Sequence, residues 1–148
     1  MSTRIASRLL LSLSAFGLMS GVVAAEDYRP PTTDEFLKGI KSYPLVASAE
    51  RRERLRTGVP KLARCAPSAE VRRLLGNPDY GYAAYKAGAV SRIMWTYVLE
   101  KKALKEVEPT ARVVVWFESD GKLQAITVHG APEIESNISR RQQTCPAT

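Results

Sequence analysis

Two β-forming runs joined by a tight turn constrain this chain more than any other feature. Residues 112–118 read RVVVWFE and residues 122–129 read KLQAITVH, and both runs are rich in β-branched and aromatic residues. The Asp120-Gly121 pair between them is a strong signal for a β-hairpin. The sequence therefore predicts an antiparallel pair of strands, which a third apolar run at 92–101 (RIMWTYVLEK) extends into a meander.

A short helix is predicted immediately before this meander. Ser68 stands where a side-chain cap would begin the helix, and Val71 and Leu75 share one face. Gly76 offers the left-handed conformation that ends many helices, and Pro78 prevents the helix from resuming. The predicted fold class is α+β, with two or three helices packed on a three- to four-stranded antiparallel sheet.

The combination of these elements resembles a known family. A helix ending in Leu-Leu-Gly-x-Pro, a Trp-x-Tyr strand and a Phe-x-x-Asp-Gly hairpin recur together in the SmpA/OmlA proteins, which are BamE-like components of the outer-membrane β-barrel assembly machinery. The matching residues are Val71, Leu75, Gly76, Pro78, Trp95, Tyr97, Val113, Val115, Phe117, Gly121 and Leu123. The resemblance covers residues 68–129 and implies a BamE-like fold with a role in the cell envelope.

The first 25 residues have the composition of an export signal. Arg4 and Arg8 supply positive charge, an apolar stretch follows, and small residues up to Ala25 permit cleavage before Glu26. The apolar stretch is shorter than the roughly 20 residues that span a bilayer, which favours a cleaved signal peptide over a membrane anchor. No cysteine follows the cleavage site to carry a lipid, so we expect a periplasmic protein that is not a lipoprotein.

The rest of the chain divides into three parts. Residues 26–67 are predicted to form an N-terminal helical extension, residues 68–130 the BamE-like helix and meander, and residues 131–148 a C-terminal tail. Within the extension, one short helix is expected after residue 33 and another between Pro44 and Gly58.

The segment 77–90, which contains Tyr80, Tyr82 and Tyr85, is expected to be an irregular loop with room for a short strand.

Cys65 and Cys145 are the two cysteines of the chain. In an oxidising compartment they are expected to form one disulfide, which would tether the tail. With no local histidine they make a poor zinc site, so neither a metal nor another cofactor is expected. His129 is the single histidine, and no nucleophile motif points to it. We therefore expect a protein without catalytic activity.

The predicted sheet has apolar residues on both faces. The resemblance assigns one set of them to the helix-covered core: Trp95, Tyr97, Val113, Val115 and Phe117. Because side chains alternate along a strand, Met94, Val114 and Trp116 lie on the opposite face, where a solvated sheet should be polar. This second face is predicted either to bind a protein partner or to be covered by the N-terminal helices or the tail.

The positive charge of the chain, formally +7, is concentrated in an arginine-rich stretch. Arg51, Arg52, Arg72 and Arg73 are candidate contacts for an acidic protein or an anionic lipid surface, and the alternative is a solvated helix face. Nucleic acid is not indicated, because the aromatic residues belong to strands and do not alternate with the basic cluster. If the second sheet face is covered, the arginine-bearing helix and the tyrosine segment 77–90 are the next candidates for partner binding.

The function expected from these features is non-catalytic protein binding by a monomeric periplasmic domain without a stable membrane anchor. The resemblance links this binding to outer-membrane protein assembly. The alternative is an inhibitor or immunity protein that blocks an exported enzyme or toxin, since small sheets of this type serve that purpose in β-lactamase-inhibitor-like folds.

Overall fold

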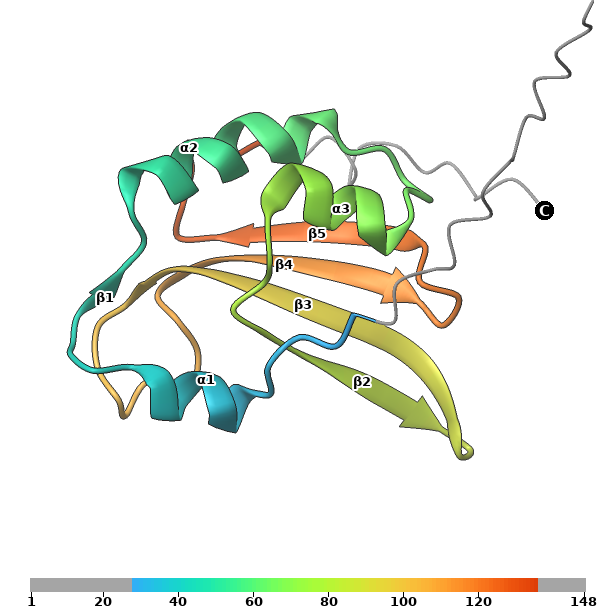
Figure 1. Ribbon diagram of the computed structural model, residues 1–148, viewed down its shortest axis with the longest axis horizontal. Helices are drawn as coiled ribbons and strands as arrows, with labels where there is room; N and C mark the ends of the chain where they lie inside the picture. The colour runs from blue at the N-terminus through green and yellow to red at the C-terminus, as the bar shows by residue number, and fades with distance from the viewer. Residues whose placement is uncertain (1–27, 136–148) are drawn as a thin grey trace, which may run out of the picture.

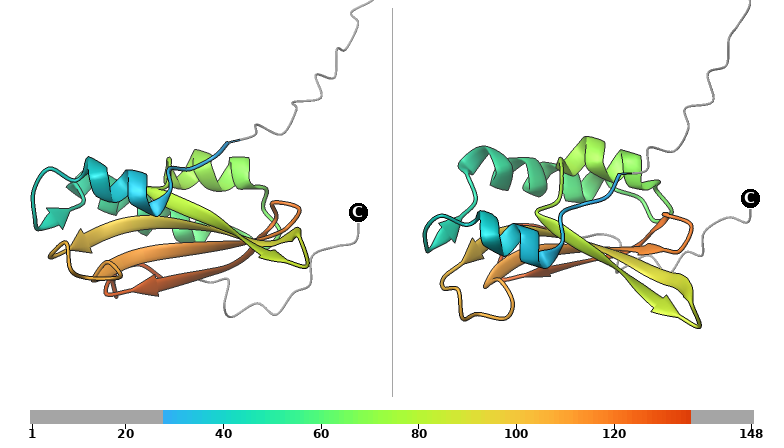
Figure 2. Two further views of the ribbon diagram at one scale, coloured as in Figure 1. Left: turned by 90° about the horizontal axis from the view of Figure 1, so that it is seen from below. Right: turned by 60° about the horizontal axis from the view of Figure 1, so that its bottom comes forward.

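A computed structural model describes residues 28–135 as an α+β fold that combines three α-helices with an antiparallel sheet (Figures 1 and 2). The helical elements are α1 (Thr33–Gly39), α2 (Ala49–Gly58), the 3-10 turn η1 (Val59–Lys61) and α3 (Ser68–Leu75). The strands are β1 (Leu45–Val46), β2 (Tyr80–Lys86), β3 (Ala89–Lys101), β4 (Ala111–Glu118) and β5 (Leu123–His129).

The long strand β3 organises the sheet. It pairs with β4 along one side, and β5 follows β4, as the predicted meander requires. On its other side β3 pairs first with β2 and then, near its end, with the two residues of β1. The 13 residues of β3 are long enough to hold both neighbours in line along one edge. The predicted α+β class is confirmed, and the sheet has five strands where three or four were expected. The BamE-like form of this fold stays a prediction.

Several predicted boundaries were wrong. Residues 80–86 form a regular strand, because β3 pairs with them along their whole length. Leu45 and Val46 also pair with β3, so α2 begins only at Ala49, with Ser48 as its cap. Ser68 is the first residue of α3 and Pro67 occupies the cap position, without a capping side chain.

The core lies between the helices and the sheet. The five strand residues assigned to it by resemblance are at most 3% exposed, so this prediction is confirmed. Leu55 and Val59 pack into the same core, which shows that the N-terminal extension is part of it. Ala131 and Ile134, at the start of the predicted tail, are also core residues.

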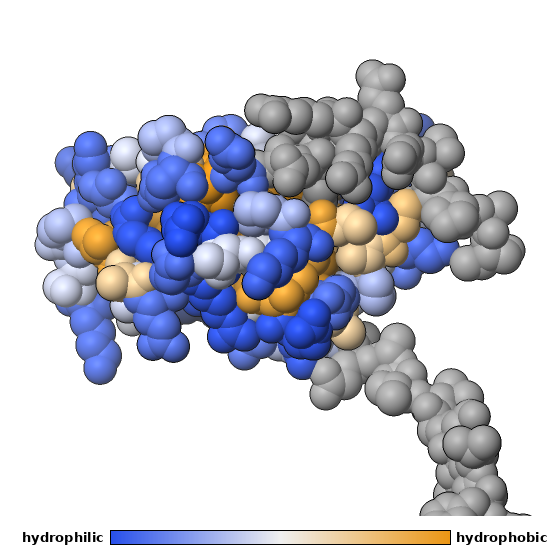
Figure 3. All heavy atoms as spheres, turned by 90° about the horizontal axis from the view of Figure 1, so that it is seen from above, coloured by the Kyte–Doolittle hydropathy of each residue, from blue (hydrophilic) through white to orange (hydrophobic). Residues whose placement is uncertain are grey.

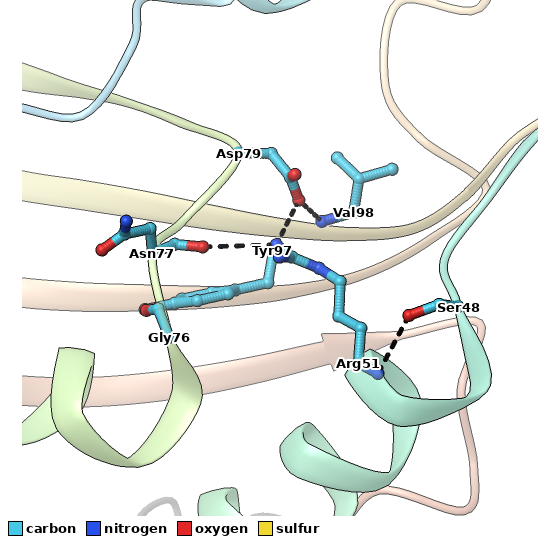
Figure 4. Close-up of polar contacts among 7 residues, drawn as sticks. All are labelled: Ser48, Arg51, Gly76, Asn77, Asp79, Tyr97 and Val98. Carbon is cyan, nitrogen blue, oxygen red and sulfur yellow. Dashed lines mark hydrogen bonds and ion pairs between the residues drawn. The ribbon is translucent and has the colours of Figure 1, made fainter.

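A polar network joins the helical layer to the sheet (Figure 4). Arg51 of α2 donates to the Asp79 carboxylate at 2.7 Å, and the same carboxylate oxygen accepts from the Val98 amide at 2.6 Å. The Arg51 guanidinium also lies 5.7 Å from the centre of the Tyr97 ring, and the Tyr97 hydroxyl donates to the Gly76 carbonyl at 3.1 Å. Burial raises the pKa of Asp79, while Arg51 and the Val98 amide act in the opposite direction.

Removing Arg51 should therefore destabilise the fold. In Arg51→Ala the Asp79 carboxylate loses its charged partner while it stays largely buried, and we expect the free energy of unfolding to fall by about 3 kcal/mol. Arg56→Ala is the matched control, because Arg56 lies on the same helix and pairs with Glu53 in solvent. Its stability should stay close to wild type. Chemical denaturation measures the free energy of unfolding of both variants. An equal decrease in Arg51→Ala and Arg56→Ala would contradict a special role for Arg51.

The raised pKa of Asp79 predicts a pH dependence of stability. The Asp79 carboxyl group keeps its proton to a higher pH in the folded state than in the unfolded state. Its contribution to stability is therefore lost as the pH rises through the folded pKa. Asp79→Asn does not titrate. The stability of the wild type relative to Asp79→Asn should thus be greatest below about pH 4, roughly the ordinary aspartate pKa, and fall as the pH rises towards neutrality. Urea denaturation across this range tests the prediction, and a relative stability that increases with pH would contradict it.

Candidate functional site

The β2–β3 hairpin projects from the edge of the sheet, away from the helices (Figures 1 and 2). Ala87 and Gly88 form its two-residue turn, and both have positive φ angles (52° and 80°), as a type I′ turn requires. Tyr82 is 50% exposed and Tyr85 is 68% exposed. We refer to residues 82–93 as the hairpin arm. The arm presents large aromatic side chains to solvent.

A groove of about 920 Å³ lies at the base of the hairpin arm. One wall is the segment 28–34, which crosses the sheet face between α3 and β2 (Figure 1). The start of α3 and the β4–β5 turn contribute Ser68 and Gly121. The groove is lined by apolar and aromatic side chains that include Ile93, Trp95 and Phe117, and the wall formed by segment 28–34 adds polar side chains that include Arg29 and Asp34. Such a lining suits an apolar side chain of a ligand or partner.

Aromatic stacking shapes the floor of this groove. The Trp95 and Phe117 rings meet edge to face with centroids 4.7 Å apart, and Tyr28 meets Trp95 in the same way at 5.6 Å. The Arg72 guanidinium then covers Tyr28 at 4.1 Å from the ring centre. This series of contacts attaches the N-terminal segment to the core and leaves the outer part of the groove open.

The second sheet face carries the residues predicted to bind a partner. The strand register aligns Tyr82, Met94, Trp116 and Ala125 in one row across four strands. Met94 and Trp116 are half-buried, so this row reaches the surface. Val114 lies in the next row of this face, with Tyr80 and Thr96, and is only 5% exposed. The interpretation of Val114 as a surface contact was therefore wrong.

Helices α2 and α3 lie on the opposite side of the sheet (Figure 2). Phe36 of α1, however, meets Tyr80 with ring centroids 5.2 Å apart. Tyr80 shares a row of the second face with Thr96 and Val114. Of the N-terminal helices, α1 therefore covers one edge of the second face. Residues 136–148, the other predicted cover, lie outside the described part of the chain.

The two tryptophans of the chain should respond differently to truncation. Trp95 is 3% exposed beneath Tyr28, and we expect Trp95→Ala to lower the free energy of unfolding by about 3–5 kcal/mol. Trp116 is half-buried on the other face, and Trp116→Ala should cost no more than about 2 kcal/mol. Thermal and chemical unfolding of the two variants checks this difference. Equal losses would mean that Trp116 is packed as tightly as Trp95.

The candidate arginines mostly hold the molecule together. Arg51 belongs to the network with Asp79, and Arg52 donates to the Leu99 carbonyl at 3.1 Å while pairing with Glu133 at 3.3 Å. The resulting contacts attach α2 to β3 and to the segment after β5.

Arg54, which was not among the candidates, donates to the Leu74 and Arg73 carbonyls and so caps the end of α3.

Arg72 and Arg73 have different surroundings. Arg72 lies over Tyr28 at the groove, and Arg73 pairs with Glu70 on the exposed side of α3. Viewed from above α2 and α3, the surface is mainly hydrophilic (Figure 3). The structure therefore separates the four candidate arginines. Arg51 and Arg52 connect different elements, Arg72 covers the groove residue Tyr28, and Arg73 stays on the surface.

The remaining candidate residues are dispersed. His129 is exposed at the end of β5, and residues 28–135 hold no group of three or more His, Cys, Asp or Glu side chains that could bind a metal. Cys65 is disulfide-bonded, and Cys145, its predicted partner, lies outside the described residues, as does the predicted signal peptide. None of the helices in the described part is long and apolar enough to cross a membrane.

Most groove residues were not predicted from the sequence as binding residues. Tyr28 and Ile93 received no binding role, and the segment with Tyr80, Tyr82 and Tyr85 was expected to be an irregular loop and named only as a secondary candidate.

A scan against protein-family models, a search of curated proteins and a search of solved structures each found no match to this chain. The resemblance to the SmpA/OmlA proteins stays a prediction.

Proposed function

We propose that this chain is a non-catalytic protein-binding domain of the cell envelope, with a role in outer-membrane protein assembly. The observation that carries the proposal is the hairpin arm, which presents Tyr82 and Tyr85 to solvent beside a groove lined by aromatic residues. Tyrosine, tryptophan and methionine are enriched at protein interfaces, because they bury large areas with little loss of conformational freedom. The row Tyr82, Met94 and Trp116 extends this surface onto the second sheet face.

The proposed compartment is the periplasm, reached through cleavage of the leader before Glu26. The disulfide at Cys65 supports an oxidising compartment, where such bonds form and persist. We also propose that the mature protein has no stable membrane anchor. On this basis we propose a soluble, monomeric domain that meets its partner at the envelope.

The alternative function, inhibition of an exported enzyme or toxin, is favoured by the shape of the arm. A narrow hairpin that projects from the sheet edge and carries exposed tyrosines can enter a cleft in another protein. Both functions use the same surface, so the identity of the partner separates them.

The test is capture of partners from periplasmic extract, with and without outer-membrane material. The double variant Tyr82→Ala/Tyr85→Ala should reduce capture at least about tenfold, since hot-spot aromatics dominate interface energies. Leu104→Ala is the matched control, because Leu104 is 63% exposed on the β3–β4 loop, away from the arm. Leu104→Ala should capture as much partner as the wild type, and all three proteins should have similar melting temperatures.

The captured proteins decide the function. Barrel-assembly components would support the envelope role, and a single soluble enzyme or toxin would support the inhibitor. Equal capture by the wild type and the tyrosine variant would contradict a binding role for the arm.

A further inference from the structure

We propose that the partner binds the hairpin arm as an extended strand, rich in acidic and aromatic residues, that adds to the free edge of β2. This inference rests on the proposed protein-binding function and specifies the chemistry of the partner. It is carried by the backbone geometry of β2, by a segment of this chain that already uses part of that edge, and by the charge of the arm.

The backbone of β2 presents hydrogen-bonding groups away from β3. The Gly81 amide points outward and donates to the Pro31 carbonyl at 2.9 Å. In an antiparallel ladder the outward direction recurs every second residue, so the amide and carbonyl of Ala83 point to the same side as those of Gly81. Ala83 is therefore the next position at which an added strand can pair.

The segment before α1 shows how an extended chain fits this edge. Pro30 lies directly on Gly81, where an added Cβ would stand 2.6 Å from the Pro30 ring, so glycine is required for this approach. Pro31 has no amide hydrogen to donate back to Gly81, and no further backbone hydrogen bond joins the described part of this segment to β2. Tyr28 turns away and packs on Trp95. Among the described residues, no strand pairs with the β2 edge beyond Gly81.

The surroundings of the edge specify the side chains of the added strand. On the helix side, an apolar or aromatic side chain beside Ala83 would enter the groove next to Ile93 and Tyr85. Lys86 and Arg92 are exposed on the arm, and neither forms an ion pair with another described residue. Carboxylates at intervening positions of the partner would complement these two charges. Strand addition supplies affinity through the main chain and specificity through alternate side chains.

The test measures binding of a fluorescein-labelled peptide of alternating glutamate and phenylalanine to the purified protein. Ala83→Pro removes the outward amide and leaves the pairing of β2 with β3 intact, so we expect binding to weaken at least about tenfold. Ala83→Ser keeps the amide and serves as the matched control, with affinity close to wild type. The same peptide with N-methyl groups on alternate amides should also lose binding. Amide exchange in both variants verifies that the β2–β3 pairing is retained.

Two results would overturn strand addition: a wild-type protein that does not bind the peptide, or an Ala83→Pro variant that binds as well as Ala83→Ser. The second result would mean that the prolines and Lys86 only protect the edge from aggregation. These failures are distinguishable from failure of the proposed function. If the tyrosine variant loses partner capture while Ala83→Pro retains it, the arm binds a protein by another mode.

Discussion

The pairing of Arg51 with Asp79 couples three parts of the fold. Asp79 precedes β2, and its amide donates to the Thr96 carbonyl while its carboxylate accepts from the Val98 amide. These two bonds hold the start of β2 against β3. Because a largely buried carboxylate needs a cationic partner, the same residue also requires α2 to be docked so that Arg51 can reach it. Docking of the helical layer and alignment of the hairpin arm thus depend on one interaction.

Because β3 is long, the part of it that stabilises the fold lies apart from the part that is proposed to bind a partner. Its inner part, from Trp95 to Leu99, is buried on both faces of the sheet. Its outer part, from Ala89 to Met94, pairs with β2 beyond the end of the helical layer and stays at least partly exposed. Of the apolar side chains in this outer part, Ile93 packs against the core, whereas Val90 and Met94 are not part of the core cluster. The exposure of Tyr82 and Tyr85 on the paired strand costs the fold little stability, because the energy of folding comes from the other end of the sheet.

Much of this architecture could be predicted because it depends on local patterns. Alternation along the strands identified the core face, and Gly76 correctly marked the end of α3. Residues 80–86 were harder to assign, because Gly81 and Ala83 have low strand propensity and only pairing with β3 makes them a strand. β1 consists of just two residues, too short for any periodicity to show.

The candidate site was less predictable for a similar reason. The partners of an arginine are set by tertiary contacts, so the sequence could not distinguish Arg52, which bridges two elements, from Arg73, which stays in solvent. Burial of Val114 likewise depends on its position in the sheet rather than on its alternation. The groove opens beyond Gly81, where the described part of the N-terminal segment makes no further backbone hydrogen bond to β2, and this depends on where the chain crosses that strand.

Charge on the arm adds to recognition in a different way from its aromatic residues. Most arginines of α2 and α3 are engaged within the molecule, so the net charge of +7 is a poor guide to the binding surface. Lys86 and Arg92 lie in solvent at the projecting end, where their field reaches an approaching partner before any contact forms. Exposed charges of this kind mainly raise association rates and are screened by salt, whereas desolvated aromatic contacts mainly slow dissociation. An acidic partner would therefore be attracted by the charged arm and retained by the groove beside it.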